Sequence, residues 1–193
     1  MEMSAAEVLE ALEESGALLR GHFILTSGRH SEGYVQCARV LEDTVLTTRL
    51  AEAAVAKVSD LDLDLVAAPA VGGIIIGFAV AQALGVNFIF SEREQGAMRF
   101  RRSFEVPHGA RVLVVEDVVT TGGSVSEVVD LVRESGGEVV GVASIIDRGG
   151  EKVFDVDLTS LVRLEVESWE PEKCPLCAAG EAVVSPGSRR LAR

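Results

Sequence analysis

The sequence predicts an α/β fold in which helices cover both faces of a parallel sheet. Three segments, 64–69, 112–117 and 138–147, are runs dominated by Val, Leu, Ile and Ala, a composition typical of strands that are buried on both faces. Segments with helical periodicity separate these runs, and this alternation favours parallel strands joined by helical crossovers. We therefore expect an α/β fold with one compact core.

The N-terminal region predicts a short helix followed by a small irregular lobe. Ser4 and Glu7 have the spacing of a capping box at the start of a helix. From 21 to 40 the pattern becomes strand-like, with turn candidates at Ser27-Gly28 and Glu32-Gly33. We interpret this lobe as a hood that covers another part of the molecule.

The remaining elements are predicted from hydrophobic periodicity and from the Gly and Pro residues that end helices and strands. The expected order is a helix at 44–58, a strand at 64–69, a helix at 73–84, strands at 87–90, 98–101 and 112–117, a helix at 124–135, and strands at 138–147 and 161–168. The helix after Ser124 carries a core-facing stripe at spacing i, i+3, i+4 and i+7, made of Val125, Val128, Val129 and Val132. No periodicity is visible from Trp169 onward.

The length predicts one domain, because domains cluster at roughly 100 to 150 residues. We divide the 193 residues into a hood at 1–43 with part of the tail, an α/β core at 44–168 and an irregular tail at 169–193. A second catalytic domain is not expected in a chain of this length, so any further step on the product would fall to a separate protein.

The composition argues against nucleic acid and membrane partners. The formal net charge is -12, the pI is near 4.7, and the 18 basic residues are scattered, so no basic stripe is available to neutralise the phosphates of a polymer. The longest apolar stretch, 72–85, is shorter than the ~20 residues that span a bilayer. The N-terminus lacks a basic segment followed by an apolar one.

The three cysteines are too few for a disulfide framework, which favours a cytoplasmic location.

The segment 112–124 predicts a binding site for a phosphate monoester. An apolar strand passes through a Thr/Gly/Ser turn into an amphipathic helix, and ligands of open α/β sheets lie at the carboxyl ends of strands. Gly122 and Gly123 let the backbone approach an anion, and the helix start offers unpaired N–H groups and the positive end of its dipole. Thr120, Thr121 and Ser124 add hydroxyl donors.

Two adjacent carboxylates, Glu116 and Asp117, directly precede this turn. Carboxylates would repel a phosphate, but they suit a ligand that also carries a diol or a hydrated magnesium ion. A ribose 5-phosphate has the required features. The alternative is a turn whose polar residues only cap the helix, and the acidic pair disfavours it. The spacing matches neither GxxxxGK[ST] nor GxGxxG, which disfavours a P-loop ATPase and a dinucleotide dehydrogenase.

The run EDVVTTGGS at 116–124 resembles the motif with which type I phosphoribosyltransferases bind 5-phosphoribosyl 1-pyrophosphate (PRPP). Three other stretches resemble the orotate phosphoribosyltransferases in particular: GHFILTSGRHS at 21–31, APAVGG at 68–73 and IIDR at 145–148. The tail from Pro171 is similar to the C-terminus of some members. The resemblance implies a helix-flanked parallel sheet with a hood, and a homodimer whose mobile loop reaches the neighbouring site. It also implies the magnesium-dependent conversion of orotate and PRPP into orotidine 5'-monophosphate and pyrophosphate, in pyrimidine biosynthesis.

The resemblance carries site residues over to this sequence. The PRPP-binding residues are then Glu116, Asp117, Val118, Val119, Thr120, Thr121, Gly122, Gly123, Ser124, Val71, Gly72, Gly73 and Arg93. The orotate-binding residues are Thr120, Arg148, Ser27 and Tyr34. Arg93 and Asp117 are the expected catalytic residues. Magnesium is expected to bind mainly through PRPP and water, without a ligand assigned to the protein.

Three of these assignments have a simpler alternative. Gly72-Gly73 would also fit an ordinary tight turn, Arg148 a surface arginine paired with Asp147, and Tyr34 ordinary packing. The chain also departs from the family pattern. Thr26 stands where members typically carry a lysine before the Ser-Gly-Arg run, and the loop at 91–96 contains neither lysine nor histidine.

If catalysis is normal, arginines of the altered loop must neutralise the pyrophosphate. Arg93 occupies a position usually held by lysine, and it is the best single candidate. The other candidates are Arg99, Arg101 and Arg102. For Arg101 and Arg102, a solvated hairpin face is the favoured interpretation.

Cys174 and Cys177 have the spacing of half a zinc site, but a closed structural site needs four ligands and no second pair of this kind follows. Cys37 and one of His22, His30 or His108 would complete it only if the fold happened to bring them together. Alternatively, two tails would share an ion across a dimer. A redox role is disfavoured because the CxxC pair lies in a Pro/Gly-rich tail and not after a strand.

Two rival functions remain. A phosphoribosyltransferase for another nucleobase would share the PRPP turn, but the SGR run at 27–29 and the IDR strand end at 146–148 favour orotate. A PRPP-binding regulator without catalysis would require a basic face and a DNA-binding segment, and neither is visible at a net charge of -12.

Overall fold

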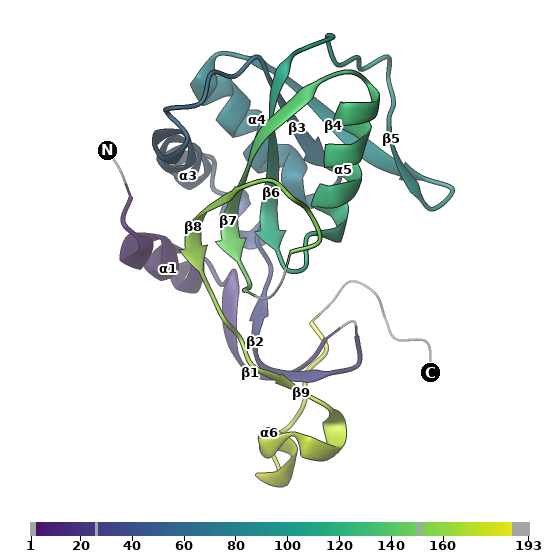
Figure 1. Cartoon of the computed structure of the whole chain (residues 1–193). Helices are drawn as coiled ribbons and strands as arrows, with labels where there is room; N and C mark the ends of the chain where they lie inside the picture. Colours follow the sequence, from purple (N-terminus) through teal and green to yellow (C-terminus); the bar gives the residue numbers. More distant parts are fainter. Residues whose placement is uncertain (1–2, 26, 150–151, 187–193) are drawn as a thin grey trace.

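The computed structural model describes residues 3–25, 27–149 and 152–186. A six-stranded sheet in the order β5-β4-β3-β6-β7-β8 forms the core, and a separate three-stranded sheet has the order β1-β2-β9. Figure 1 shows the small sheet beyond the carboxyl ends of the core strands, on the side toward which β6, β7 and β8 point. The α/β class predicted from the sequence is confirmed.

Five of the six core strands are parallel: β3 (Leu65–Pro69), β4 (Asn87–Glu94), β6 (Arg111–Val119), β7 (Glu138–Asp147) and β8 (Leu158–Arg163). The edge strand β5 (Ala97–Phe100) is antiparallel to β4, because the tight turn at Gln95-Gly96 joins the two as a hairpin. The first strand of this hairpin runs to Glu94 and not, as predicted, only to Phe90.

Helices cover both faces of the core sheet (Figure 1). One face packs against α1 (Ala5–Glu14), α3 (Thr44–Lys57) and α4 (Gly72–Leu84), and the opposite face packs against α5 (Gly123–Glu134). The predicted stripe of α5 is confirmed, since all four of its valines are buried. Each fully buried valine contributes about 1.5–3 kcal/mol of transfer free energy, so this stripe fixes which side of α5 faces the sheet.

Capping residues set the starts of two helices. Ser4 and Glu7 form the predicted capping box of α1, in which the side chain of each accepts a hydrogen bond from the other's backbone N–H. Asp43 caps α3 by accepting hydrogen bonds from the N–H groups of Val45 and Leu46. In contrast, neither α4 nor α5 has a side-chain cap at its first turn.

The small sheet combines the two ends of the chain. Its strands are β1 (Leu18–Ile24), β2 (His30–Val35) and β9 (Ser168–Trp169), all antiparallel to their neighbours. The chain passes from β2 through α2 (Ala38–Leu41) into α3, and after β9 it continues into a short 3₁₀ turn, η1 (Pro171–Lys173), and into α6 (Pro175–Ala178). The C-terminal segment therefore contributes β9 to the small sheet, and η1 and α6 follow directly after that strand.

Two sequence-based assignments were wrong in detail. Glu32-Gly33 lies inside β2 and is not a turn, because Gly33 serves close packing there: a Cβ would come within 2.8 Å of the Val166 side chain. The last core strand spans Leu158–Arg163 instead of 161–168, since pairing with β7 ends at Arg163 and the chain then leaves for the small sheet. Among the described helices, none combines the length and apolar character needed to cross a membrane.

Candidate active site

The turn between β6 and α5 lies at the carboxyl edge of the core sheet. Gly122, the N-cap of α5, has φ of +83°, a left-handed conformation that strongly favours glycine. A Cβ at this position would also overlap the ring of Phe154. A small cavity of about 60 Å³ opens at the turn. Its walls are Glu116, Val118, Val119, Thr120, Gly122, Gly123, Ser124 and Val125.

A second helix start packs against the acidic pair. A Cβ on Gly72 would lie 2.7 Å from a carboxylate oxygen of Asp117, and one on Gly73 would lie 2.8 Å from the carbonyl oxygen of Val115 and 3.2 Å from Glu116 Oε1. Only glycine permits this approach of α4 to β6. Gly72-Gly73 is therefore more than a tight turn, because it brings a second helix N-terminus to the acidic pair. The peptide bond between Ala70 and Val71, just before α4, is cis.

The starts of α4 and α5 are adjacent because β3 and β6, which precede them, are neighbouring parallel strands. The first N–H groups of a helix have no intrahelical acceptor, and the helix dipole adds partial positive charge there. Since no side chain caps either start, both remain available to anionic groups. The arrangement suits a ligand with two separated phosphate groups.

Glu116 is buried and Asp117 is half-buried between these helix starts. Burial and the neighbouring Asp117 raise the pKa of Glu116 to about 9, and burial also raises the pKa of Asp117. Cys37 lies close enough that, after burial itself, the two carboxylates contribute to raising the pKa of its thiol. Without a ligand, the acidic pair therefore holds a proton at neutral pH, and hydroxyl donors or a cation would favour its ionised form.

Arg148 follows β7, next to the turn. Its backbone N–H donates to the carbonyl of Val119 at 2.8 Å, and its buried Nε has no hydrogen-bond partner among the described residues. Burial lowers the pKa of Arg148. The alternative pairing with Asp147 is wrong, because Asp147 pairs with Lys152 at 2.6 Å instead. A buried guanidinium donor that lacks a protein acceptor is suited to a carboxylate or carbonyl of a ligand.

Arg93 lies on the β4–β5 hairpin and contacts α5. Its Nη2 is 2.6 Å from Oε1 of Glu127, which raises the pKa of Arg93 and, despite the opposing effect of burial, lowers that of Glu127. Arg101 and Arg102 form exposed ion pairs with Glu94 and Glu92, as expected for a solvated hairpin face. Arg99 also pairs with Glu94.

The predicted residues of the hood lie on or beside β1 and β2. Ser27 is exposed, and its hydroxyl accepts a hydrogen bond from the N–H of Arg29. Tyr34 is half-buried, with its ring centroid 5.9 Å from that of Phe23, so ordinary packing accounts for its position in this structure. Thr26 lies outside the described residues.

Residues 43–172 match the sequence profile of the phosphoribosyl transferase domain. The chain is 47% identical over 194 aligned positions to the orotate phosphoribosyltransferase of Caldanaerobacter subterraneus subsp. tengcongensis, with 98% of this chain and 100% of that protein covered. The chain belongs to the orotate phosphoribosyltransferase family.

Solved structures of this family have the same fold. The orotate phosphoribosyltransferase of Aeropyrum pernix superposes with a TM-score of 0.73 at 28% identity, covering 82% of this chain and 94% of that one. The orotate phosphoribosyltransferase of Mycobacterium tuberculosis H37Rv in complex with PRPP superposes with a TM-score of 0.66 at 28% identity, covering 83% and 96%. The predicted family and fold are thus confirmed.

Three residues near this phosphoribosyltransferase site were not predicted from the sequence. Lys152 donates to the carbonyl oxygens of Thr120 and Gly149, each at 2.7 Å, and so joins the turn to the segment after β7. Phe154 packs against Gly122, and Glu127 pairs with Arg93. The 32-residue separation of Lys152 from Thr120 and the 34-residue separation of Arg93 from Glu127 give no local signal for these contacts. Only the loop after β7 brings Lys152 and Phe154 back to the turn.

Proposed function

We propose that this chain catalyses the transfer of the phosphoribosyl group from PRPP to orotate, giving orotidine 5'-monophosphate and pyrophosphate. The activity is that of an orotate phosphoribosyltransferase, a pentosyltransferase of pyrimidine biosynthesis. Its relatives carry this name over almost the full length of the chain. Within the site, the observation that carries the proposal is the acidic pair of buried Glu116 and half-buried Asp117 between two uncapped helix starts.

In this proposal, PRPP spans the two helix starts. The turn from Thr120 to Ser124 binds the 5'-phosphate through backbone N–H groups and hydroxyls, while the start of α4 at Gly72-Gly73 binds the pyrophosphate. Glu116 and Asp117 accept hydrogen bonds from the ribose hydroxyls. The turn backbone at Val118, Val119 and Val71 completes the pocket.

Bond cleavage at the anomeric carbon places positive charge on the ribose and negative charge on pyrophosphate. The ionised Asp117 and Glu116 stabilise the former, and N–H donors at α4 stabilise the latter. Arg93 would reach the pyrophosphate after exchanging its contact with Glu127 for the ligand. Asp117 and Arg93 are thus the proposed catalytic residues.

Orotate would lie beside the turn, next to Arg148. Its carboxylate would accept hydrogen bonds from the guanidinium, whose Nε lacks an acceptor among the described residues. Thr120, Ser27 and Tyr34 are the other proposed contacts of the base. The small sheet, which lies beyond the carboxyl ends of the core strands (Figure 1), would cover the base and exclude water.

Magnesium is the proposed cofactor. The oxygen-rich acidic pair fits a hard cation that keeps most of its waters and binds mainly through the phosphates of PRPP. Bound there, it would neutralise charge that develops on the leaving pyrophosphate. Glu116 and Asp117 would hold its water ligands, so that no direct protein ligand is required.

A homodimer and a cytoplasmic location are also part of the proposal. An apolar stripe runs along the exposed side of the start of α4, where Val71, Ile75 and Phe78 are 82%, 50% and 58% exposed. Because this stripe is continuous with the site, we expect a second copy of the chain to pack there.

Sedimentation of the wild type should show a dimer and that of Phe78→Glu a monomer. A monomeric wild type at micromolar concentration would contradict this assembly.

The activity is tested by following orotate consumption with PRPP, with and without a magnesium chelator. We expect magnesium-dependent loss of orotate and an equal release of pyrophosphate. Binding of PRPP without consumption of orotate, but with consumption of another base, would favour the alternative nucleobase enzyme. Binding of PRPP with no base consumed would favour the regulator.

A further inference from the structure

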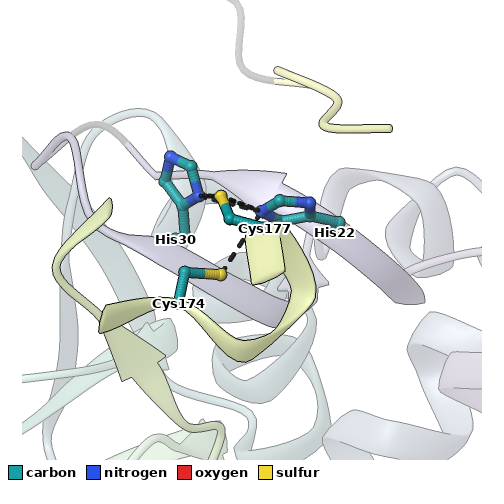
Figure 2. A group of neighbouring side chains, drawn as sticks. All are labelled: His22, His30, Cys174 and Cys177. Carbon is teal, nitrogen blue, oxygen red and sulfur yellow. Dashed lines mark hydrogen bonds between the residues drawn. The ribbon is translucent and has the colours of Figure 1, made fainter. Parts of the chain in front are cut away.

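Four potential metal ligands converge outside the active site. Figure 2 shows the side chains of His22, His30, Cys174 and Cys177 directed toward a common point, and their ligand atoms all lie within 4.8 Å of one another. The two histidines come from β1 and β2, whereas the two cysteines lie at the start of α6 and within it. His22 and Cys174 are 152 residues apart in the sequence.

Three nitrogen–sulfur distances are close to those of tetrahedral coordination. Zn–S bonds of ~2.3 Å and Zn–N bonds of ~2.0–2.1 Å at tetrahedral angles place nitrogen and sulfur ligands about 3.5 Å apart and nitrogen ligands about 3.3 Å apart. Cys174 Sγ and Cys177 Sγ are 3.5 and 3.6 Å from His22 Nε2, and Cys177 Sγ is 3.2 Å from His30 Nδ1. The two ring nitrogens are 2.8 Å apart, about 0.5 Å closer than in a tetrahedral site, so they would have to separate to accept an ion between them.

Hydrogen bonding alone does not satisfy this cluster. Nδ1 of His22 lies 2.9 Å from the carbonyl oxygen of Glu181, which only accepts, so in the neutral imidazole this nitrogen carries the proton and Nε2 has a single lone pair. Three groups face that lone pair: Nδ1 of His30 and the two sulfur atoms. One lone pair accepts one good hydrogen bond, whereas a metal ion would bind all four groups at once.

The surroundings of the cluster also fit a structural metal site. The hydrogen bond from His22 to the carbonyl of Glu181 is the kind of outer contact that orients a metal-bound imidazole. His22, His30 and Cys174 are buried. Two thiolates and two neutral imidazoles offset the charge of a divalent ion, so the loaded site would be neutral in this buried position.

We propose that His22, His30, Cys174 and Cys177 bind one zinc ion, which fastens the C-terminal segment around α6 to the β1–β2 hairpin. Two sulfur and two nitrogen ligands select zinc among the common divalent ions. On binding, the two thiol protons pass to solvent and four metal–ligand bonds form. With all four positions filled by protein, the ion is structural and not catalytic.

The site would reinforce contacts that are already present between these segments. Val184 donates to the carbonyl of His22 at 2.8 Å and accepts from Ile24 N–H at 2.9 Å, and β9 pairs with β2. Arg29 donates to Ser168 and pairs with Glu170. The zinc ion would therefore hold the small sheet in its position at the edge of the candidate active site. Cys37, which the sequence offered as a further ligand for Cys174 and Cys177, does not belong to this cluster, since it lies near the acidic pair.

Metal analysis of the full chain, purified without a metal-affinity column, tests the proposal. We expect roughly one zinc per chain after dialysis, retained in the control His108→Gln and lost in Cys177→Ser and His30→Gln. Reconstitution with cobalt should give the visible absorption of a tetrahedral thiolate site in the wild type and in His108→Gln, but not in Cys177→Ser or His30→Gln. A wild type that binds neither metal after reduction, or that retains zinc in both ligand variants, would overturn the assignment.

A second measurement guards against ligand variants that fail to fold. A strong chelator should lower the Tm of the wild type by several degrees and leave that of folded Cys177→Ser unchanged, because only the wild type has an ion to lose. An equal response of the two proteins would count against the site. Mass spectrometry without reductant should find Cys174 and Cys177 as free thiols once zinc is removed under nitrogen. A native disulfide between them would overturn the proposal.

Discussion

Replacement of Glu116 by glutamine should stabilise the ligand-free protein at neutral pH. Glu116 is 9% exposed, and its pKa is raised from 4.5 to about 9 by burial and by Asp117. At a pH between these two pKa values, Glu116 has lost its proton in the unfolded chain and keeps it in the folded chain. The contribution of this group to stability is therefore fully present below pH 4.5 and declines as the pH rises toward 9.

The size of the effect follows from that window. A pH of 7 is about 2.5 units above the pKa of Glu116 in the unfolded chain. The free energy of unfolding is therefore lower at pH 7 than at low pH by at most about 1.36 × 2.5, or roughly 3.4 kcal/mol. Asp117 titrates in the same site and shares the effect. Glutamine keeps the acceptor that receives the N–H of Asp117 but does not titrate. We therefore expect Glu116→Gln to be about 1–3 kcal/mol more stable than the wild type at pH 7.

Urea unfolding at pH 5, 7 and 8.5, without PRPP or magnesium, measures this difference. The stability gap between Glu116→Gln and the wild type should be small at pH 5 and should widen with pH. The control Glu52→Gln replaces an exposed carboxylate on α3 and should follow the wild type at each pH. A gap that is independent of pH, or a less stable variant at pH 8.5, would refute the argument from burial.

Three further substitutions test the assigned roles. Asp117→Asn should lower kcat by about 10²-fold or more with little change in Tm, since the partner of a ribose hydroxyl is weakened. Arg148→Ala should raise KM for orotate by about 10–100-fold and that for PRPP by less than about 3-fold, because one charged hydrogen-bonding group is lost. Gly122→Ala should lower the free energy of unfolding by about 1–3 kcal/mol, owing to its positive φ and the overlap with Phe154. Steady-state kinetics and urea unfolding provide these values.

Two of these variants, Arg148→Ala and Gly122→Ala, have a matched control within the chain. Arg102→Ala removes an exposed ion pair with Glu92 and should leave both KM values near those of the wild type. Gly123→Ala adds a Cβ where no atom lies within 4 Å, so it should cost far less stability than Gly122→Ala. Wild-type turnover in Asp117→Asn, or equal effects of Arg148→Ala on both substrates, would require other roles for these residues.

Much of the fold was predictable because local patterns and the final packing agree. The four valines of α5, the capping box at Ser4 and the aliphatic run of β7 each specify an element without reference to distant residues. Predictions failed where tertiary contacts overrode local preference. Gly33 reads as a turn residue, but in the structure it makes room for Val166 within a strand.

The sequence by itself determined the α/β class, the family and the position of the Gly-rich turn that we propose binds phosphate. These features depend on residues that are contiguous in the chain, such as 116–124, and on a strand–helix alternation with a single compact solution. The structure decided which distant groups meet. It placed Gly72 against Asp117, left Arg148 Nε without a partner among the described residues, and joined two histidines of a hairpin to two cysteines of the tail. Such contacts join residues that are far apart in the sequence, as His22 and Cys174 are by 152 residues, and no local spacing encodes them.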